Sequence, residues 1–93
     1  MASTVDDITI EYVDGGVVTV KQINKVILTK GAWATIMFEY EDWDKRKEAY
    51  GPRKYSIQRF QKKNNEYKRK SKFNISSKDQ AMKIIAVLNE WIA

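Results

Sequence analysis

One stretch of the chain alternates without interruption, Trp33-Ala34-Thr35-Ile36-Met37-Phe38-Glu39-Tyr40-Glu41-Asp42-Trp43. Every second residue falls on the same face of an extended chain, and one face collects the small, aliphatic and aromatic side chains of Ala34, Ile36, Phe38 and Tyr40. A period of two predicts a β-strand with one buried face. The fold is therefore expected to be built on a half-buried sheet.

Three further strands are expected beside this one. Residues 25–29 lead into a turn at Lys30-Gly31, where glycine can adopt a positive φ. Residues 53–62 and 66–75 are typical of a hairpin joined by Lys63-Asn64-Asn65, because asparagine tolerates the left-handed conformation. The sheet is thus predicted to have four antiparallel strands.

The last of these strands carries lysines at a spacing of two. Its alternation predicts that Lys68, Lys70 and Lys72 share one face. Tyr67, Phe73 and Ile75 would share the opposite face, where we expect tyrosine and phenylalanine to be structural, as we do for Tyr55. A sheet face with lysines at every second position can follow a phosphate backbone.

A helix is predicted to begin after Ser77. The pattern Ser77-x-x-Gln80 is a capping box, and Asp79 suits the positive helix end. A stripe at helical spacing contains Ala81, Ile84, Leu88 and Trp91, and Trp91 is assigned to the core or to a dimer contact. The helix has more apolar residues than one sheet can cover, which predicts a homodimer through Met82, Ile85, Val87, Leu88 and Ile92.

Two segments lie outside this pattern. Residues 1–23 contain a turn signal at Asp14-Gly15-Gly16 and are interpreted as an N-terminal segment that forms an extra hairpin or an arm. Residues 44–52 lack alternation, contain Gly51-Pro52 and predict a mobile basic loop. The expected fold over residues 24–93 is α+β, a curved four-stranded antiparallel sheet followed by one C-terminal helix and dimeric through that helix.

Composition excludes several classes of function. The chain has 93 residues and neither cysteine nor histidine, which removes disulfides, thiolate zinc sites and serine–histidine catalysis. No phosphate-loop or dinucleotide motif is present, so no cofactor is expected. The acidic N-terminus is followed by no apolar run of the kind found in signal peptides or membrane spans, which predicts an intracellular protein.

Charge is unevenly distributed along the chain. Residues 45–72 hold twelve basic side chains and two acids, Glu48 and Glu66, which gives this segment a net charge of +10. A field of this density raises the local concentration of polyanions. A solvated surface would also explain a run of charge, but it would leave the aromatic residues unexplained.

Aromatic residues interrupt the polar faces of the predicted strands. Trp33, Trp43 and Phe60 alternate onto those faces, where unstacked bases could rest on them. Taken singly, each tryptophan could equally belong to a second small core or a dimer contact. Combined with the basic residues, they predict a nucleic-acid site composed of Lys30, Trp33, Trp43, Lys45, Arg46, Lys47, Arg53, Lys54, Phe60, Lys62, Lys68, Lys70 and Lys72.

Carboxylates offer a weaker, catalytic interpretation. Glu39 and Glu41 share a face, with Asp42, Asp44 and Lys45 nearby, so a magnesium-dependent nuclease site can be drawn. The spacing matches no strong motif, and acids on an exposed strand also discourage edge pairing. We therefore expect a protein without enzymatic activity or a metal site.

The segment from Lys54 to Ala81 resembles the positive cofactor four family of transcriptional coactivators. That family has a hairpin, a lysine-rich strand ending in an Ile-Ser-Leu-like tripeptide, and a helix that opens with an acid and a glutamine. Asn74-Ile75-Ser76-Ser77-Lys78-Asp79-Gln80 occupies that junction here. The resemblance covers about residues 25–92. The chain departs from the family in lacking a glycine before Ile75, in its longer loop at residues 44–52 and in its N-terminal segment.

The resemblance implies a homodimer whose curved sheets form channels for single-stranded DNA, with dimerisation through the C-terminal helix. It also implies that Lys30, Lys54, Lys68 and Lys72 contact the DNA backbone, and that Trp43 and Phe60 lie near the family's stacking aromatics. Members occur in eukaryotes, bacteria and bacteriophages, where the setting is transcription, or replication and recombination.

Residues and resemblance together predict a dimeric, sequence-tolerant single-stranded DNA-binding protein. Proteins of transcription or replication are its expected partners besides DNA. One alternative is RNA, because nothing in the sequence distinguishes a 2′-hydroxyl. Another alternative is a protein-interaction module whose basic face docks acidic partners.

Overall fold

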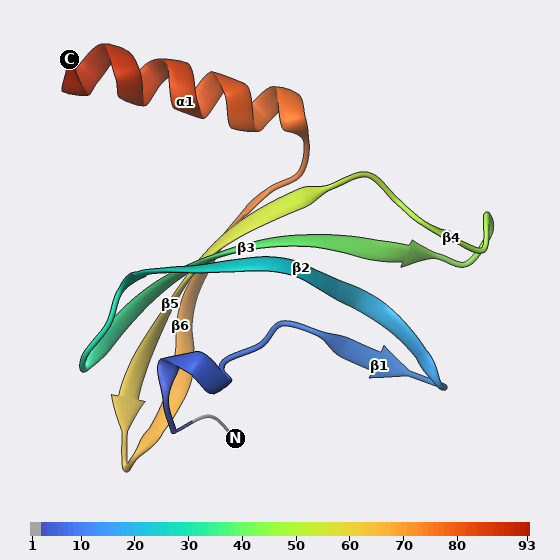
Figure 1. Ribbon diagram of the computed structural model, residues 1–93, viewed down its shortest axis with the longest axis horizontal. Coiled ribbons are helices and arrows are strands. Elements are labelled where there is room, and N and C mark those ends of the chain that lie inside the picture. The colour runs from blue at the N-terminus through green and yellow to red at the C-terminus, as the bar shows by residue number, and fades with distance from the viewer. Residues whose placement is uncertain (1–2) are drawn as a thin grey trace.

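The structure, a computed structural model, describes residues 3–93 and consists of a curled antiparallel sheet and a C-terminal helix (Figure 1). The sheet order is β1-β2-β3-β5-β6, and β4 pairs with β3. Within the described residues, no helix has the length and apolar content that crossing a membrane requires. The elements are η1 (Val5–Asp7), β1 (Tyr12–Asp14), β2 (Val17–Thr29), β3 (Trp33–Asp44), β4 (Ala49–Tyr50), β5 (Lys54–Lys63), β6 (Glu66–Ile75) and α1 (Lys78–Ile92).

The class α+β, with an antiparallel sheet and one C-terminal helix, is confirmed, but the prediction of four strands is wrong. The sheet has six strands, because β1 of the N-terminal hairpin and the short β4 join the four expected strands. Gly15 and Gly16 have positive φ angles of 57° and 81° and make the tight turn between β1 and β2. β2 continues through the expected boundary at residues 23 and 24, so the N-terminal segment and the sheet share a strand.

β3 lies at the centre of the sheet and carries most of the core. Ala34, Ile36 and Phe38 are at most 1% exposed, which confirms the alternation predicted for this strand. Their face of the sheet is called the inner face, and the face of Trp33 and Met37 is called the outer face. The inner face is buried because the chain folds back over it.

The covering element is the N-terminal strap, residues 5–12. Ile8 is buried in one cluster with Ile36, Phe38 and Phe60. Lys25 holds the strap by donating hydrogen bonds from its Nζ to the carbonyls of Val5, Asp6 and Ile8, at 2.6, 3.0 and 2.7 Å. Burial of a side chain such as Ile8 stabilises the fold by about 1.5–3 kcal/mol. The strap is therefore part of the core and not a free arm.

The β5–β6 hairpin has the expected turn and an unexpected bulge. Asn64 and Asn65 adopt φ angles of 55° and 62°, as predicted. The register shifts between Arg59 and Phe60, so Gln58 pairs with Lys72 whereas Gln61 pairs with Lys68. A one-residue slip exchanges the faces of a strand. The prediction that Lys68, Lys70 and Lys72 share one face is therefore wrong, and Tyr67 is likewise separated from Phe73 and Ile75.

Residues 44–52 form a short hairpin where a mobile loop was predicted. β4 pairs with the end of β3, with Tyr50 opposite Trp43, and Gly51 donates its amide to the carbonyl of Asp42 at 2.9 Å. The Asp44 carboxylate accepts hydrogen bonds from the amides of Arg46 and Lys47, at 2.9 and 3.3 Å. The Asp44 side chain therefore stabilises the turn between β3 and β4.

α1 leaves the end of β6 and stands away from the sheet (Figure 1). Ser77 caps it by accepting a hydrogen bond from the amide of Gln80 at 3.1 Å, and the Gln80 side chain returns to the amide of Ser76 at 3.0 Å. No residue of α1 is buried, and Trp91 is 77% exposed. Trp91 is therefore not a core residue, and neither is Phe73 on β6, which is 54% exposed.

Candidate nucleic-acid interface

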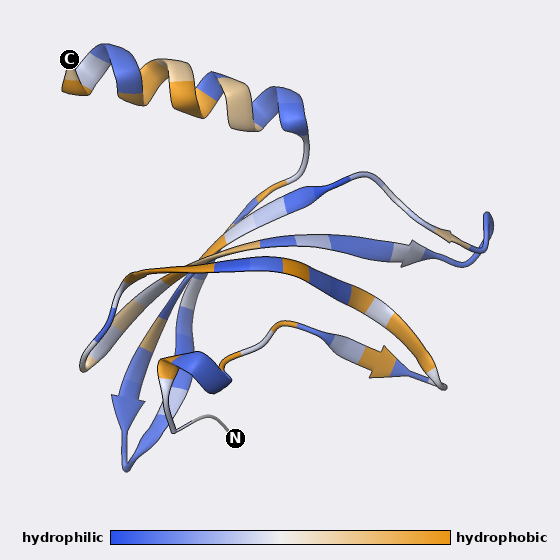
Figure 2. Ribbon diagram, viewed as in Figure 1, coloured by the Kyte–Doolittle hydropathy of each residue, from blue (hydrophilic) through white to orange (hydrophobic). Residues whose placement is uncertain are grey.

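The β5–β6 hairpin concentrates exposed positive charge at one edge of the sheet. Seven of its basic residues are exposed, and within residues 3–93 none of the seven forms an ion pair with a carboxylate. Figure 2 shows this hairpin as a largely hydrophilic element. We call these residues the free basic set: Arg59, Lys62, Lys63, Lys68, Arg69, Lys70 and Lys72.

The bulge distributes the free basic set over both faces of the sheet. Trp33, Gln61 and Lys68 form one row across three strands on the outer face. Phe60 pairs with Arg69 and Gln58 pairs with Lys72, so these two cations belong to the inner face. The hairpin therefore presents charge around its edge and not from one flat face.

Trp33 on the outer face stacks with a cation of the free basic set. The guanidinium carbon of Arg59 lies 4.7 Å from the centre of the Trp33 ring, and Trp33 remains 42% exposed. A guanidinium is planar and stacks on aromatic faces. The pair offers a flat, cationic surface of the kind on which an unstacked base rests.

Lys30 is held close to this surface by contacts between two turns. The Tyr67 hydroxyl donates to the carbonyl of Gly31 at 2.6 Å, and the amide of Lys62 donates to the carbonyl of Ala32 at 2.7 Å. The turn that carries Lys30 is thereby tied to the hairpin. The structure thus brings six residues predicted for the site to this edge of the sheet, distributed over its two faces: Lys30, Trp33, Lys62, Lys68, Lys70 and Lys72.

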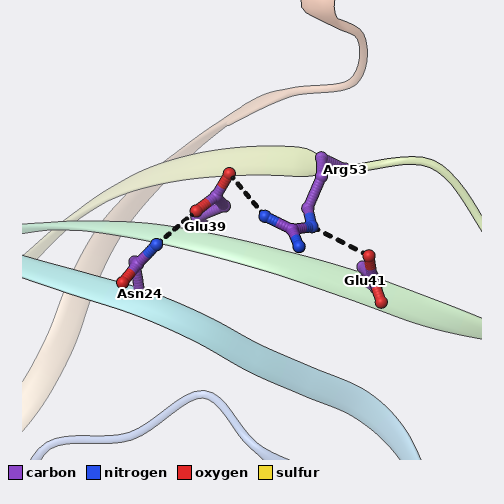
Figure 3. Close-up of polar contacts among 4 residues, drawn as sticks. All are labelled: Asn24, Glu39, Glu41 and Arg53. Atoms are coloured by element: carbon purple, nitrogen blue, oxygen red, sulfur yellow. Dashed lines mark hydrogen bonds and ion pairs between the residues drawn. The ribbon is translucent and has the colours of Figure 1, made fainter.

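Two predicted contacts, Arg53 and Lys54, are already paired with carboxylates. The Arg53 guanidinium lies 3.0 Å from Glu39 and 2.8 Å from Glu41 (Figure 3). Its hydrogen bond to Glu41, with a second to Glu39, raises the pKa of Arg53. Their charges are compensated within the sheet, so the structure removes both residues from the candidate site.

The same pairing accounts for the acids of β3. Asn24 donates to Glu39 Oε1 at 2.6 Å, and this hydrogen bond, followed by that of Arg53, lowers the pKa of the Glu39 carboxyl. Lys54 Nζ lies 2.9 Å from Asp42 Oδ2, and its hydrogen bond to this carboxylate raises the pKa of Lys54. Across residues 3–93, no group of three or more acidic side chains gathers in a way that could hold a metal ion.

A second group of predicted site residues lies at the opposite end of β3. Trp43 packs edge-on against Tyr50, with ring centres 5.1 Å apart, beside the turn that carries Lys45, Arg46 and Lys47. Ten residues separate Trp43 from Trp33 on the same strand, which corresponds to about 34 Å. The predicted site is thus divided into two separate clusters.

Phe60 was predicted to lie on the ligand face, and the structure corrects this placement. It is 7% exposed and packs with Ile8 and Ile36 in the core. Sequence reasoning missed Arg59, Lys63 and Arg69. Their charge could have been found, because all three lie within the basic segment at residues 45–72. The face of Arg69 could not, because the bulge that sets it has no glycine to mark it.

No protein-family model, curated protein or solved structure matches the chain. The resemblance to positive cofactor four therefore rests on the residues of this chain alone.

Proposed function

We propose that this protein binds single-stranded DNA in a sequence-tolerant manner through the β5–β6 hairpin. The observation that carries the proposal is the free basic set, seven exposed cations on one edge hairpin that have no carboxylate partner in the part of the chain that the structure describes. Unpaired cations release the counterions of a phosphate backbone, which supplies affinity without reading sequence. Such binding suits processes that expose single strands, namely transcription or replication and recombination.

Stacking on Trp33 and Arg59 is proposed to favour a single strand over a duplex. The bases of a duplex are already stacked on one another and cannot use these side chains. Trp33, Gln61 and Lys68 share a row, so a base on Trp33 lies beside a cation for its phosphate. The Trp43 cluster is outside the proposed site.

We also propose that two copies associate through α1. Its exposed apolar residues are 40–79% accessible: Met82, Ile85, Val87, Leu88, Trp91 and Ile92. A contiguous apolar surface of this kind marks an interaction site. Figure 2 shows the apolar colour along one side of the helix. In a symmetric dimer each helix covers the equivalent surface on the other copy.

A competition experiment tests the proposed function. A labelled single-stranded DNA is bound to the protein and displaced with unlabelled single-stranded DNA, duplex DNA, RNA of the same sequence or a polyglutamate peptide. Single-stranded DNA should displace the label at the lowest concentration. Equal displacement by RNA would favour RNA binding, and equal displacement by polyglutamate would favour a module for acidic protein segments.

A further inference from the structure

A groove runs between the N-terminal strap and the inner face of the sheet, with a volume of about 680 Å³. Residues 9–12 of the strap form one wall, and β3, β5 and β6 form the floor. The strap is fixed over it, because the Gln22 side chain accepts hydrogen bonds from the Thr9 hydroxyl and the Ile10 amide at 3.0 and 3.1 Å. A volume of this size is ordinary for a small-ligand site.

Gln58 on the floor of the groove has an acceptor without a partner. The side chain is 4% exposed, and its Oε1 makes no hydrogen bond within residues 3–93. Ser56 donates its only hydroxyl proton to Asn74 Oδ1 at 2.8 Å, and its Oγ accepts a hydrogen bond from Gln58 Nε2 at 3.0 Å. Oε1 is therefore the atom left free, and a buried free acceptor is costly unless a ligand satisfies it.

The groove has a positive end and a negative end. Arg69 and Lys72 line it beside Phe60 and Gln58 and carry no carboxylate partner within residues 3–93. Asp42, six residues along β3 from the partner of Gln58, lines the far end with Glu11. Lys54 compensates the charge of Asp42, so Glu11 supplies the net negative charge there. An anionic group is therefore favoured next to Gln58 and disfavoured about 20 Å away.

We propose that this groove holds one nucleotide of the bound strand. An N–H on the edge of its base donates to Gln58 Oε1, and its phosphate lies between Arg69 and Lys72. Every base presents at least one N–H on its pairing edge, so one acceptor fixes a base without choosing among the four. The inference rests on the proposed function and adds to it a site on the inner face, separate from Trp33.

Thymine strands test the proposal, because thymine has a single N–H, at N3. An oligothymidylate and the same strand methylated at every N3 have equal charge and similar stacking. The parent protein should bind the methylated strand about three- to tenfold more weakly, as the loss of one neutral hydrogen bond implies. Gln58→Met, which removes the acceptor and keeps the length of the side chain, should bind both strands equally. Equal binding of both strands by the parent protein would overturn the inference.

This comparison separates the inference from the proposed function. If the parent binds both strands tightly and equally, single-strand binding stands and the groove site fails. If no strand binds, the side-chain amide signals of Gln58 in an NMR spectrum are followed during titration with thymidine monophosphate, and these signals are assigned by their loss in Gln58→Met. A saturable shift would support a nucleotide site in the groove without strand binding, and no shift would overturn it. The parent comparison needs no variant, so it holds even if Gln58→Met does not fold.

Discussion

Arg59 lies over the indole of Trp33, with its guanidinium carbon 4.7 Å from the ring centre, on the outer face of the sheet. The two residues come from neighbouring strands, and the register places Arg59 diagonally next to Trp33. Within residues 3–93, this is the only pair on the outer face of the sheet in which an exposed aromatic ring of the proposed site contacts a cation that has no carboxylate partner. Stacking and charge can therefore be separated at one position.

Arg59→Lys should weaken binding to single-stranded DNA while leaving its salt dependence unchanged. Lysine keeps the charge and so the counterion release, but it has no planar group to stack. Trp33→Ala should cost about 1–3 kcal/mol of binding free energy with a similarly unchanged salt slope. The measurement is fluorescence anisotropy of a short labelled strand over a range of salt concentrations.

Trp43→Ala is the matched control for this prediction. Trp43 is on the same face of the same strand as Trp33 but about 34 Å further along that strand, so its loss should not affect the binding of a short DNA strand. Equal losses for the two tryptophan variants would show that the site extends along the whole of β3.

The free basic set predicts a strong dependence of affinity on salt. If about five phosphates are neutralised, the slope of log affinity against log salt should be roughly −3 to −4 for a single strand. Lys68→Ala and Lys72→Ala should each reduce the slope by less than about one unit and weaken every sequence equally. Lys78→Ala removes the same charge from α1 and should leave the slope unchanged. A parent slope near zero would contradict contact between the hairpin and the phosphates.

Much of the fold was predictable because local patterns agree with the tertiary structure. The alternation of residues 34–40 is buried as expected, and the Asn64-Asn65 turn has the predicted left-handed geometry. The face of Lys72 was not predictable, since the bulge after Arg59 is set by pairing with β6 and not by a local signal. The strap was missed because Ile8 is fixed by contacts with strands distant in sequence.

The sequence shows the residue types of the proposed site, but not their positions. The dense run of cations at residues 45–72 includes the basic residues of the β5–β6 hairpin. Ion pairing decides which cations lack a carboxylate partner. Arg53 and Lys54 lie in the same basic segment of the sequence as Lys68, but they form ion pairs with acids of β3. Such cross-strand neutralisation depends on register, which the sequence of one strand does not show.

Glu39 should contribute stability that disappears at acid pH. Hydrogen bonds from Asn24 and Arg53 lower the pKa of its carboxyl in the folded protein, so the contribution is present above the unfolded pKa and is lost as pH falls through the folded pKa. Glu39→Gln should therefore reduce the free energy of unfolding by about 0.5–1 kcal/mol at pH 7, and by almost nothing at about pH 2–3.

Urea unfolding at the two pH values, at one fixed protein concentration, measures this effect. Glu90→Gln provides the control, because Glu90 is an exposed carboxylate on α1 that makes no ion pair within residues 3–93. A Glu39→Gln variant whose loss of stability is the same at both pH values would show that the ionised form of Glu39 is not what stabilises the sheet.

α1 should mediate dimerisation, and its two sides allow a matched pair of variants. Ile85 is 49% exposed on the apolar side, whereas Ala86 lies on the polar side between Lys83 and Glu90. Ile85→Asp should convert the dimer to a monomer, because association would bury an unpaired carboxylate. Ala86→Asp adds the same charge at the next residue, and this variant should still sediment with the mass of a dimer.

Because α1 contributes no buried residue to the sheet of its own chain, the Ile85→Asp monomer should remain folded, with the β-sheet signal of the parent in circular dichroism. A parent that sediments as a monomer at high concentration would show that the exposed side of α1 does not join two copies.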